Sequence, residues 1–124
     1  MEYLHMDNEK YQRIIQEYVP GRQVTLAHII ASPDKILYKK LGLDPKLDYE
    51  KAAIGITTVI PSETAVIMAD IAMKSSGIDI GFVDRFSGSL IFTGTVSEVE
   101  AAMVAQLDYV EKKLGYTVCE VTKT

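Results

Sequence analysis

The sequence predicts a single α/β domain, more narrowly an α+β domain, and three observations support this. The chain has 124 residues, a length that suits one domain with one hydrophobic core. Apolar runs of strand length alternate with two longer segments of helical periodicity. From residue 52 onward the predicted order is β-α-β-β-α-β. This order is the split βαβ motif, so we expect a ferredoxin-like antiparallel sheet with both helices on one face.

The beginning of the chain predicts two elements ahead of that motif. Residues 1–12 are polar and uneven, which indicates a flexible tail, and residues 13–19 indicate a short extended segment. Pro20-Gly21 is a turn signal, and residues 24–30 are rich in β-branched side chains, which favour a strand.

A short helix and a loop follow. Ser32 as N-cap and Pro33 at the first helical position predict a helix that runs to Leu41 and stops at Gly42. Residues 43–51 contain a proline and several acidic residues, and they predict a loop.

The split motif itself has clear helix boundaries. One helix is expected to start at Ser62-Glu63 and to end at Gly77. The other is expected to start with a capping box between Ser97 and Glu100, and to end at Gly115. The strands of the motif are predicted at 52–60, 78–83, 89–93 and 116–121.

Few residues have the chemistry of a catalytic or metal site. His28 lies in a predicted strand without a catalytic partner, and Cys119 has no base as a sequence neighbour. His5 lies in the predicted tail, and two distant histidines with one cysteine do not make a zinc site. We therefore predict no catalytic, cofactor or metal site, although an enzyme that uses His28 or Cys119 stays a weaker alternative.

Charge and hydropathy limit the classes of partner. The net charge is −4 and no block of Lys or Arg occurs, which argues against nucleic-acid binding. No apolar run approaches the roughly 18–20 residues that cross a bilayer, and the first residues lack the pattern of a secretory signal. We expect a cytoplasmic protein with no membrane partner.

Four co-linear stretches carry a resemblance to a known family. They are Ile14–Ala31, Ala53–Thr57 together with Pro61–Thr64, Ile80–Gly88, and Val121–Thr124. In these stretches, and in their order, the chain strongly resembles the circularly permuted single-domain shell proteins of bacterial microcompartments (BMC). The resemblance covers the chain from Ile14 to its end, and such proteins occur in ethanolamine, propanediol and choline utilisation compartments.

The resemblance implies a function of assembly for residues 13–124, taken as one permuted BMC domain with an N-terminal β extension. Members of the family form hexamers that tile into a shell around enzymes of an aldehyde-generating catabolic pathway. The expected partners are therefore further copies of the chain, other shell proteins and encapsulated enzymes.

The resemblance also implies roles for particular residues. Lys74 matches the lysine at the hexamer edge. The turn that approaches the central pore matches Asp84, Arg85, Phe86, Ser87 and Gly88. The strand of a β-barrel that caps the pore in this branch matches Arg13, Ile14, Ile15, Gln16, Glu17, Tyr18 and Val19.

Two alternatives stay open at this point. Ser32 occupies a position where many unpermuted relatives carry an edge arginine, so a bent or screw-like hexamer competes with a flat one. Ferredoxin-like domains also serve as small-molecule-binding regulatory modules, and the fold does not decide between the two functions.

Overall fold

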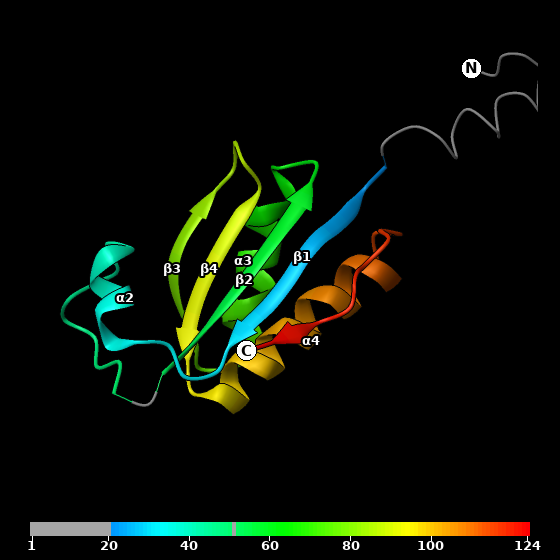
Figure 1. Ribbon diagram of the computed structural model, residues 1–124. Helices are drawn as coiled ribbons and strands as arrows, with labels where there is room; N and C mark the ends of the chain where they lie inside the picture. Colours follow the sequence, from blue (N-terminus) through cyan, green and yellow to red (C-terminus); the bar gives the residue numbers. More distant parts are fainter. Residues whose placement is uncertain (1–20, 51) are drawn as a thin grey trace, which may run out of the picture.

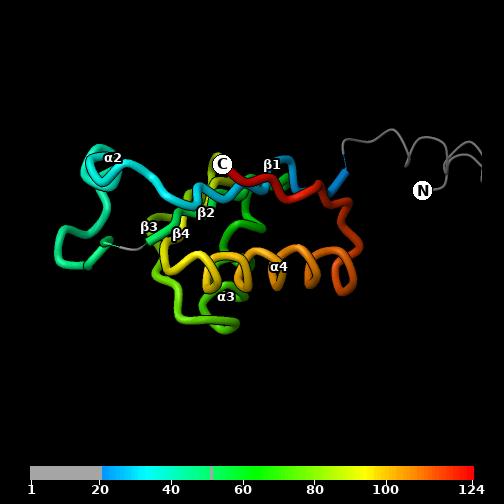
Figure 2. The backbone as a smooth tube through the Cα atoms, turned by 60° about the horizontal axis from the view of Figure 1, so that its bottom comes forward, coloured from blue at the N-terminus to red at the C-terminus, as the bar shows by residue number. Residues whose placement is uncertain are grey.

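The computed structural model describes residues 21–50 and 52–124, which form one five-stranded sheet with helices. The strands are β1 (Gln23–Ile30), β2 (Ala53–Ile60), β3 (Asp79–Asp84), β4 (Ser89–Gly94) and β5 (Thr122–Lys123). The helices are α2 (Lys35–Lys40), α3 (Thr64–Ser75) and α4 (Val96–Lys112). Helices α3 and α4 lie side by side on one face of the sheet, which confirms the predicted α+β class (Figures 1 and 2). The predicted tail and barrel segment lie outside the described residues.

The strand order is β3-β4-β2-β1-β5. Strand β4 lies between β2 and β3 and is antiparallel to both, as the split βαβ motif requires. Strand β1 precedes the motif in the chain, yet it lies between β2 and β5. It is antiparallel to β2 and parallel to β5, so the prediction of a wholly antiparallel sheet is wrong at this edge.

The main core lies between the sheet and the two long helices. Phe92 from β4 and Met103 from α4 are fully buried there, and each such side chain contributes about 1.5–3 kcal/mol by leaving water. Gly55 on β2 has a packing role, because a Cβ at this position would lie 2.4 Å from the Phe92 ring. The ring occupies the space that a side chain on β2 would fill.

A smaller core covers part of the opposite face. Tyr38 of α2 and Leu43 pack on Ile54 and Ile91 of the sheet. The Tyr38 hydroxyl donates to the Ala52 carbonyl at 2.8 Å, and its ring stacks on Tyr49 with 4.3 Å between centroids. These contacts hold α2 and the following loop against the sheet.

Two predicted helix caps are displaced. Asp34, not Ser32, caps α2, since its Oδ1 accepts from the Ile36 amide at 3.0 Å. The capping box of α4 joins Thr95 and Glu98 instead of Ser97 and Glu100, so the helix begins two residues earlier than its predicted cap implied. Helix α3 begins at Thr64, directly after the expected start, and Glu63 makes no side-chain cap bond.

The last predicted strand is also displaced. Instead of residues 116–121, β5 comprises only Thr122 and Lys123. Thr117 forms one isolated parallel bridge with Gln23. A register shift in β1 between Val24 and Leu26, seen where β1 pairs with β2, accompanies this break.

Candidate functional site

The β3–β4 turn is built by the carboxylate of Asp84. Its Oδ1 accepts from the Phe86 amide at 2.9 Å, and its Oδ2 accepts from the Ser87 hydroxyl at 2.9 Å. These two bonds, the amide bond first, lower the pKa of Asp84 below its ordinary value. The turn closes when the Gly88 amide donates to the Asp84 carbonyl at 2.8 Å. The hydrogen bonds of Asp84 therefore shape the loop rather than leaving it free.

Gly88 fixes this turn against β2. Its φ is 79°, in the left-handed region that glycine adopts without strain. Its carbonyl accepts from the Val59 amide at 3.0 Å, and a Cβ would lie 2.3 Å from the Val59 carbonyl oxygen. Only glycine fits here, so the turn has one position relative to the end of β2.

The tip of the turn presents an aromatic side chain to solvent. Phe86 is 81% exposed, the highest value among the exposed large hydrophobic residues described. The Arg85 guanidinium lies 4.9 Å from its ring centroid, a cation–π distance. A surface depression of about 550 Å³ borders the tip, and its lining includes Val66, Phe82 and Val83. An apolar surface of this kind marks an interaction site more often than a catalytic one.

Lys74 lies in the last turn of α3 and points to solvent. Its side chain is 72% exposed, and its Nζ lies 2.8 Å from Asp70 Oδ2 one helical turn earlier. The hydrogen bond to Asp70 and the charge of that carboxylate raise the pKa of Lys74 above its ordinary value. The ammonium is thus charged at neutral pH and available at the surface.

The two candidate catalytic residues, His28 and Cys119, both make contacts that stabilise the fold. Both ring nitrogens of His28 bond hydroxyls of the C-terminal segment, Nδ1 with Thr122 at 2.6 Å and Nε2 with Thr124 at 2.9 Å. Cys119 is half-buried and packs against the main core. Within residues 21–50 and 52–124, neither side chain hydrogen-bonds a carboxylate or lines the pocket or the depression described here.

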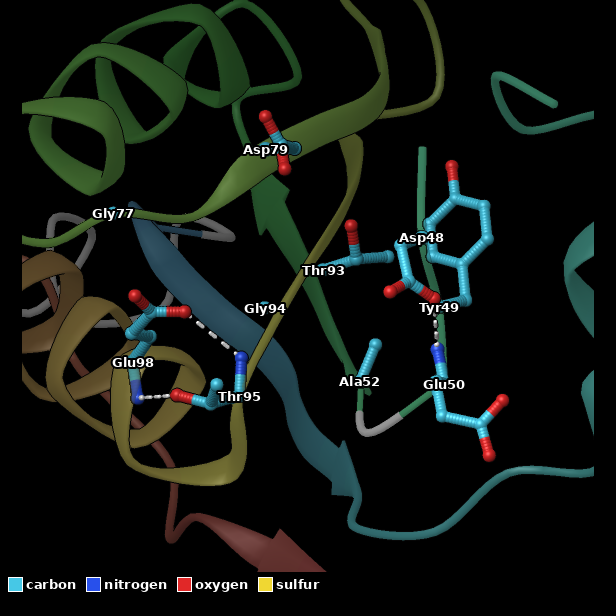
Figure 3. Close-up of a pocket in the computed structure, with 10 residues that line it drawn as sticks. All are labelled: Asp48, Tyr49, Glu50, Ala52, Gly77, Asp79, Thr93, Gly94, Thr95 and Glu98. Atoms are coloured by element: carbon cyan, nitrogen blue, oxygen red, sulfur yellow. Dashed lines mark hydrogen bonds between the residues drawn. The ribbon is translucent and has the colours of Figure 1, made fainter. Parts of the chain in front are cut away.

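A pocket of about 320 Å³ lies between the loop before β2 and the start of α4. Figure 3 shows the residues that line it. Three of the carboxylates that line this pocket form hydrogen bonds or an ion pair within the protein. Glu98 accepts from the Thr95 amide at 2.9 Å, Asp48 accepts from the Glu50 amide at 2.9 Å, and Glu50 pairs with Lys35 at 2.9 Å. Over residues 21–50 and 52–124, no group of three or more His, Cys, Asp or Glu side chains is placed to hold a metal ion.

The structure also exposes apolar residues that sequence reasoning did not single out. Val66 and Val104 are 51% and 63% exposed, and Val83 and Val121 are 40% and 39% exposed. Helical periodicity alone would have placed Val104 opposite the buried face of α4, which is the one signal that the sequence contained. Within the described residues, no helix combines the length and apolarity needed to cross a membrane.

Comparison with known proteins gives the same picture of a protein that acts by assembly. Residues 53–122 match the BMC domain model. The chain is 50% identical over 112 residues to the bacterial microcompartment shell protein PduU of Salmonella typhimurium strain LT2, covering 90% of this chain and 93% of PduU. It is 49% identical over 119 residues to the shell protein EutS of Escherichia coli strain K12, covering 96% of this chain and 100% of EutS.

Solved structures agree. A flat hexamer of CutR superimposes with a TM-score of 0.77 at 47% identity, covering 90% of this chain and 99% of that chain. CutR has also been solved as a screw with a 41.9 Å pitch, again with a TM-score of 0.77. These relatives are structural shell proteins and not enzymes. The chain belongs to the BMC-domain family of bacterial microcompartment shell proteins.

Proposed function

We propose that this protein forms cyclic hexamers that tile into the shell of a microcompartment in the bacterial cytoplasm. The observation that carries the proposal is the near full-length match to CutR at 47% identity, in a relative solved as a flat hexamer. The position of β1 supports a permuted arrangement, because β1 lies outside the matched residues 53–122 and yet within the sheet. The enclosed pathway is expected to be ethanolamine, choline or propanediol utilisation.

Three parts of the chain take different roles in this hexamer. The Asp84–Gly88 turn approaches the central axis, and its rigid hydrogen bonding and protruding Phe86 suit a ring of loops around a narrow opening. Lys74 lies at the hexamer edge, where its exposed ammonium meets a neighbouring hexamer. Residues 13–19, which the family resemblance assigns to a barrel that caps the pore, fall outside the described part of the chain. Other shell proteins and encapsulated enzymes are the further partners in this proposal.

Whether the hexamer is flat or screw-like depends on small changes at the subunit contacts. CutR has been solved in both forms at 45–47% identity to this chain. Ser32, at the place of an edge arginine in many unpermuted relatives, removes one cation from the tile edge. Fewer edge charges weaken the contacts between neighbouring hexamers, so Ser32 bears on tiling as well as on the competition between flat and screw-like forms.

Light scattering on the purified protein tests the proposal. A mass of six subunits is expected, followed by sheets or tubes in electron micrographs of the concentrated sample. A monomer or dimer at every concentration would contradict it. A mass that changes only when a metabolite is added would favour the regulatory alternative.

A further inference from the structure

We propose that the pocket beside the start of α4 binds a primary alkylammonium ion, the group that a small free amine and a lysine side chain have in common. The pocket lies where β3 begins and β4 ends (Figure 3). Its volume of about 320 Å³ lies at the lower end of the range for small-molecule sites, so it suits a small ligand. The residues that line it come from one subunit, so binding there does not depend on the hexamer.

A buried hydroxyl in the wall of this pocket lacks a partner. Thr93 is only 2% exposed, and its Oγ1 makes no hydrogen bond to any described residue. Figure 3 shows this hydroxyl directed into the space between Asp79 and Tyr49. A buried polar group without a partner is unfavourable. Its presence in the pocket wall therefore points to a ligand that completes it.

Asp79 brings a carboxylate to the same place. It pairs with Thr93 in the antiparallel ladder of β3 and β4, and the side chains of such a pair lie on one face of the sheet. The next pair, Ile80 and Phe92, packs in the main core, so Asp79 and Thr93 face the opposite side, where Tyr49 packs on the smaller core. A donor between the two side chains can thus reach a carboxylate and a hydroxyl at once.

The charged groups of the pocket are all acidic. Asp48, Glu50, Asp79 and Glu98 line it, and no lysine or arginine of the described residues does. Lys35 pairs with Glu50, whereas the other three carboxylates have no ion pair in the part of the chain that the structure describes. A concave surface that gathers negative charge without counter-ions attracts a cation.

Tyr49 adds an aromatic surface to this wall. One face of its ring stacks on Tyr38, and its hydroxyl donates to the Asp44 carbonyl at 2.9 Å, so the rest of the ring is what a ligand can meet. Burial, and then the charges of Asp44 and Asp79, raise the pKa of Tyr49 above its ordinary value, which places the Asp79 carboxylate within electrostatic reach of this side chain. The alkyl chain of an ammonium ion can pack on such a ring while its nitrogen bonds the oxygens.

These groups favour a primary ammonium over other cations. In the chain from residue 21 to 50 and from 52 to 124, no three carboxylates are close enough together to hold one metal ion. A primary ammonium has three N–H donors, which separate oxygens can share. A quaternary ammonium has none, so it would leave the Thr93 hydroxyl without a partner.

A methyl NMR titration of the full-length protein tests the proposal. n-Butylammonium and tetramethylammonium chlorides are the probes, at constant ionic strength and neutral pH. Butylammonium is expected to shift the signal of Ala52, which lines the pocket, and to saturate, whereas Ala65 in the main core stays unchanged. Tetramethylammonium is expected to bind at least about tenfold more weakly, because it cannot donate a hydrogen bond.

Three variants separate the groups that carry the binding. Asp79→Asn is expected to weaken butylammonium binding about tenfold, since a charged acceptor is lost. Thr93→Val is expected to weaken it about threefold without lowering stability in urea, because the hydroxyl gives up no bond within the protein. Asp108→Asn is the matched control, because it removes the same charge from an exposed site on α4 outside the pocket, and it is expected to keep the affinity.

N-acetyl-lysine methylamide distinguishes the two sources of the ammonium. An affinity no higher than that of butylammonium would assign the pocket to a free amine, and a markedly higher one to a lysine of another protein. The absence of a saturable shift at Ala52 with every primary ammonium would overturn the proposal. Equal affinity for tetramethylammonium, or an equal loss in Asp108→Asn, would also overturn it, because either would show only unspecific attraction of cations to an acidic surface.

Discussion

Gly88 couples backbone conformation to packing at a single residue. Its φ is 79°, and a Cβ would meet the Val59 carbonyl oxygen at 2.3 Å. Gly42 has a similar φ of 73°, but a Cβ there meets nothing within 4 Å. The two glycines therefore separate the cost of conformation from the cost of a clash.

Gly88→Ala is expected to destabilise the protein more than Gly42→Ala does. Each substitution is expected to lower the free energy of unfolding by about 1–2 kcal/mol, because it places a side chain in the left-handed region. Gly88→Ala adds roughly 1–3 kcal/mol for displacing β2. Urea unfolding at one fixed protomer concentration measures both free energies. Equal losses would show that the turn moves away from β2 without cost.

Gln106 is a second residue with an energetic consequence. It is fully buried, and its Oε1 accepts from the Thr57 hydroxyl at 3.2 Å. Its Nε2 has no hydrogen-bond partner among the described residues. An unpaired buried amide group costs about 1–3 kcal/mol, so this pair lowers stability relative to an apolar core.

The double variant Thr57→Val with Gln106→Met is expected to raise the free energy of unfolding by about 1 kcal/mol. Gln106→Met alone gains less, because it leaves the Thr57 hydroxyl without its acceptor. The difference between single and double variants in urea unfolding isolates this term. A loss in the double variant would mean that a buried water already satisfies the amide.

At the scale of elements, helix boundaries depend on which of two equivalent caps is used. Thr95 and Ser97 are each followed three residues later by a glutamate, so both satisfy the capping-box pattern. The structure uses Thr95, directly after β4 ends at Gly94. Ser76 also donates to the Glu98 carbonyl at 2.9 Å, which ties this helix start to the end of α3.

Thr95→Ala is expected to lower the free energy of unfolding by about 1 kcal/mol. Ser97→Ala is the matched control, and its effect is expected to stay within about 0.5 kcal/mol because Ser97 lies beyond the cap. Thermal unfolding of both variants gives the comparison. A larger loss of stability for Ser97→Ala would show that Ser97, as predicted from the sequence, is the N-cap of α4.

Elements that follow from local periodicity were predicted from the sequence, whereas elements that depend on a distant partner were not. Strands β1 to β4 and the long helices follow from local periodicity, because each buries one face against the main core. Strand β5 does not, since residues 116–121 alternate like a strand but need a regular partner edge. The register shift at Val24 and Leu26 interrupts β1 near that edge. The exposed valines could not be singled out from the sequence for a related reason, because one exposed valine is informative only where a second one from another element lies beside it.

His28 holds this short last strand in place. Its bonds to Thr122 and Thr124 are joined by backbone bonds between Thr124 and both Ile29 and Ala31, each at 2.9 Å. His28→Ala is expected to speed amide exchange at Thr124 and Ala31, because the strand opens locally without global unfolding. Amides in the middle of β2 serve as the internal control. Unchanged exchange at all sites would assign the strand's stability to the backbone bonds alone.

At the scale of the whole molecule, assembly and tiling are separable if they use different surfaces. Lys74 lies in the last turn of α3, at the opposite end of this helix from Val66, which lines the depression beside the β3–β4 turn. Lys112 offers a close match to Lys74, because it forms the same i,i+4 ion pair with Asp108 and is 69% exposed against 72%. The two lysines thus differ mainly in their place on the molecule.

Lys74→Ala is expected to leave the hexamer intact and to abolish sheets in electron micrographs of the concentrated protein. Lys112→Ala is expected to leave both intact, since an exposed i,i+4 pair contributes only about 0.3–0.5 kcal/mol to the fold. Raising the salt concentration should weaken sheets of the unsubstituted protein before it dissociates hexamers, because exposed charges are screened more strongly than buried apolar contacts. If Lys74→Ala forms sheets at the same concentration as the unsubstituted protein, Lys74 is not part of the contact between tiles. That contact would then be made by side chains that carry no charge.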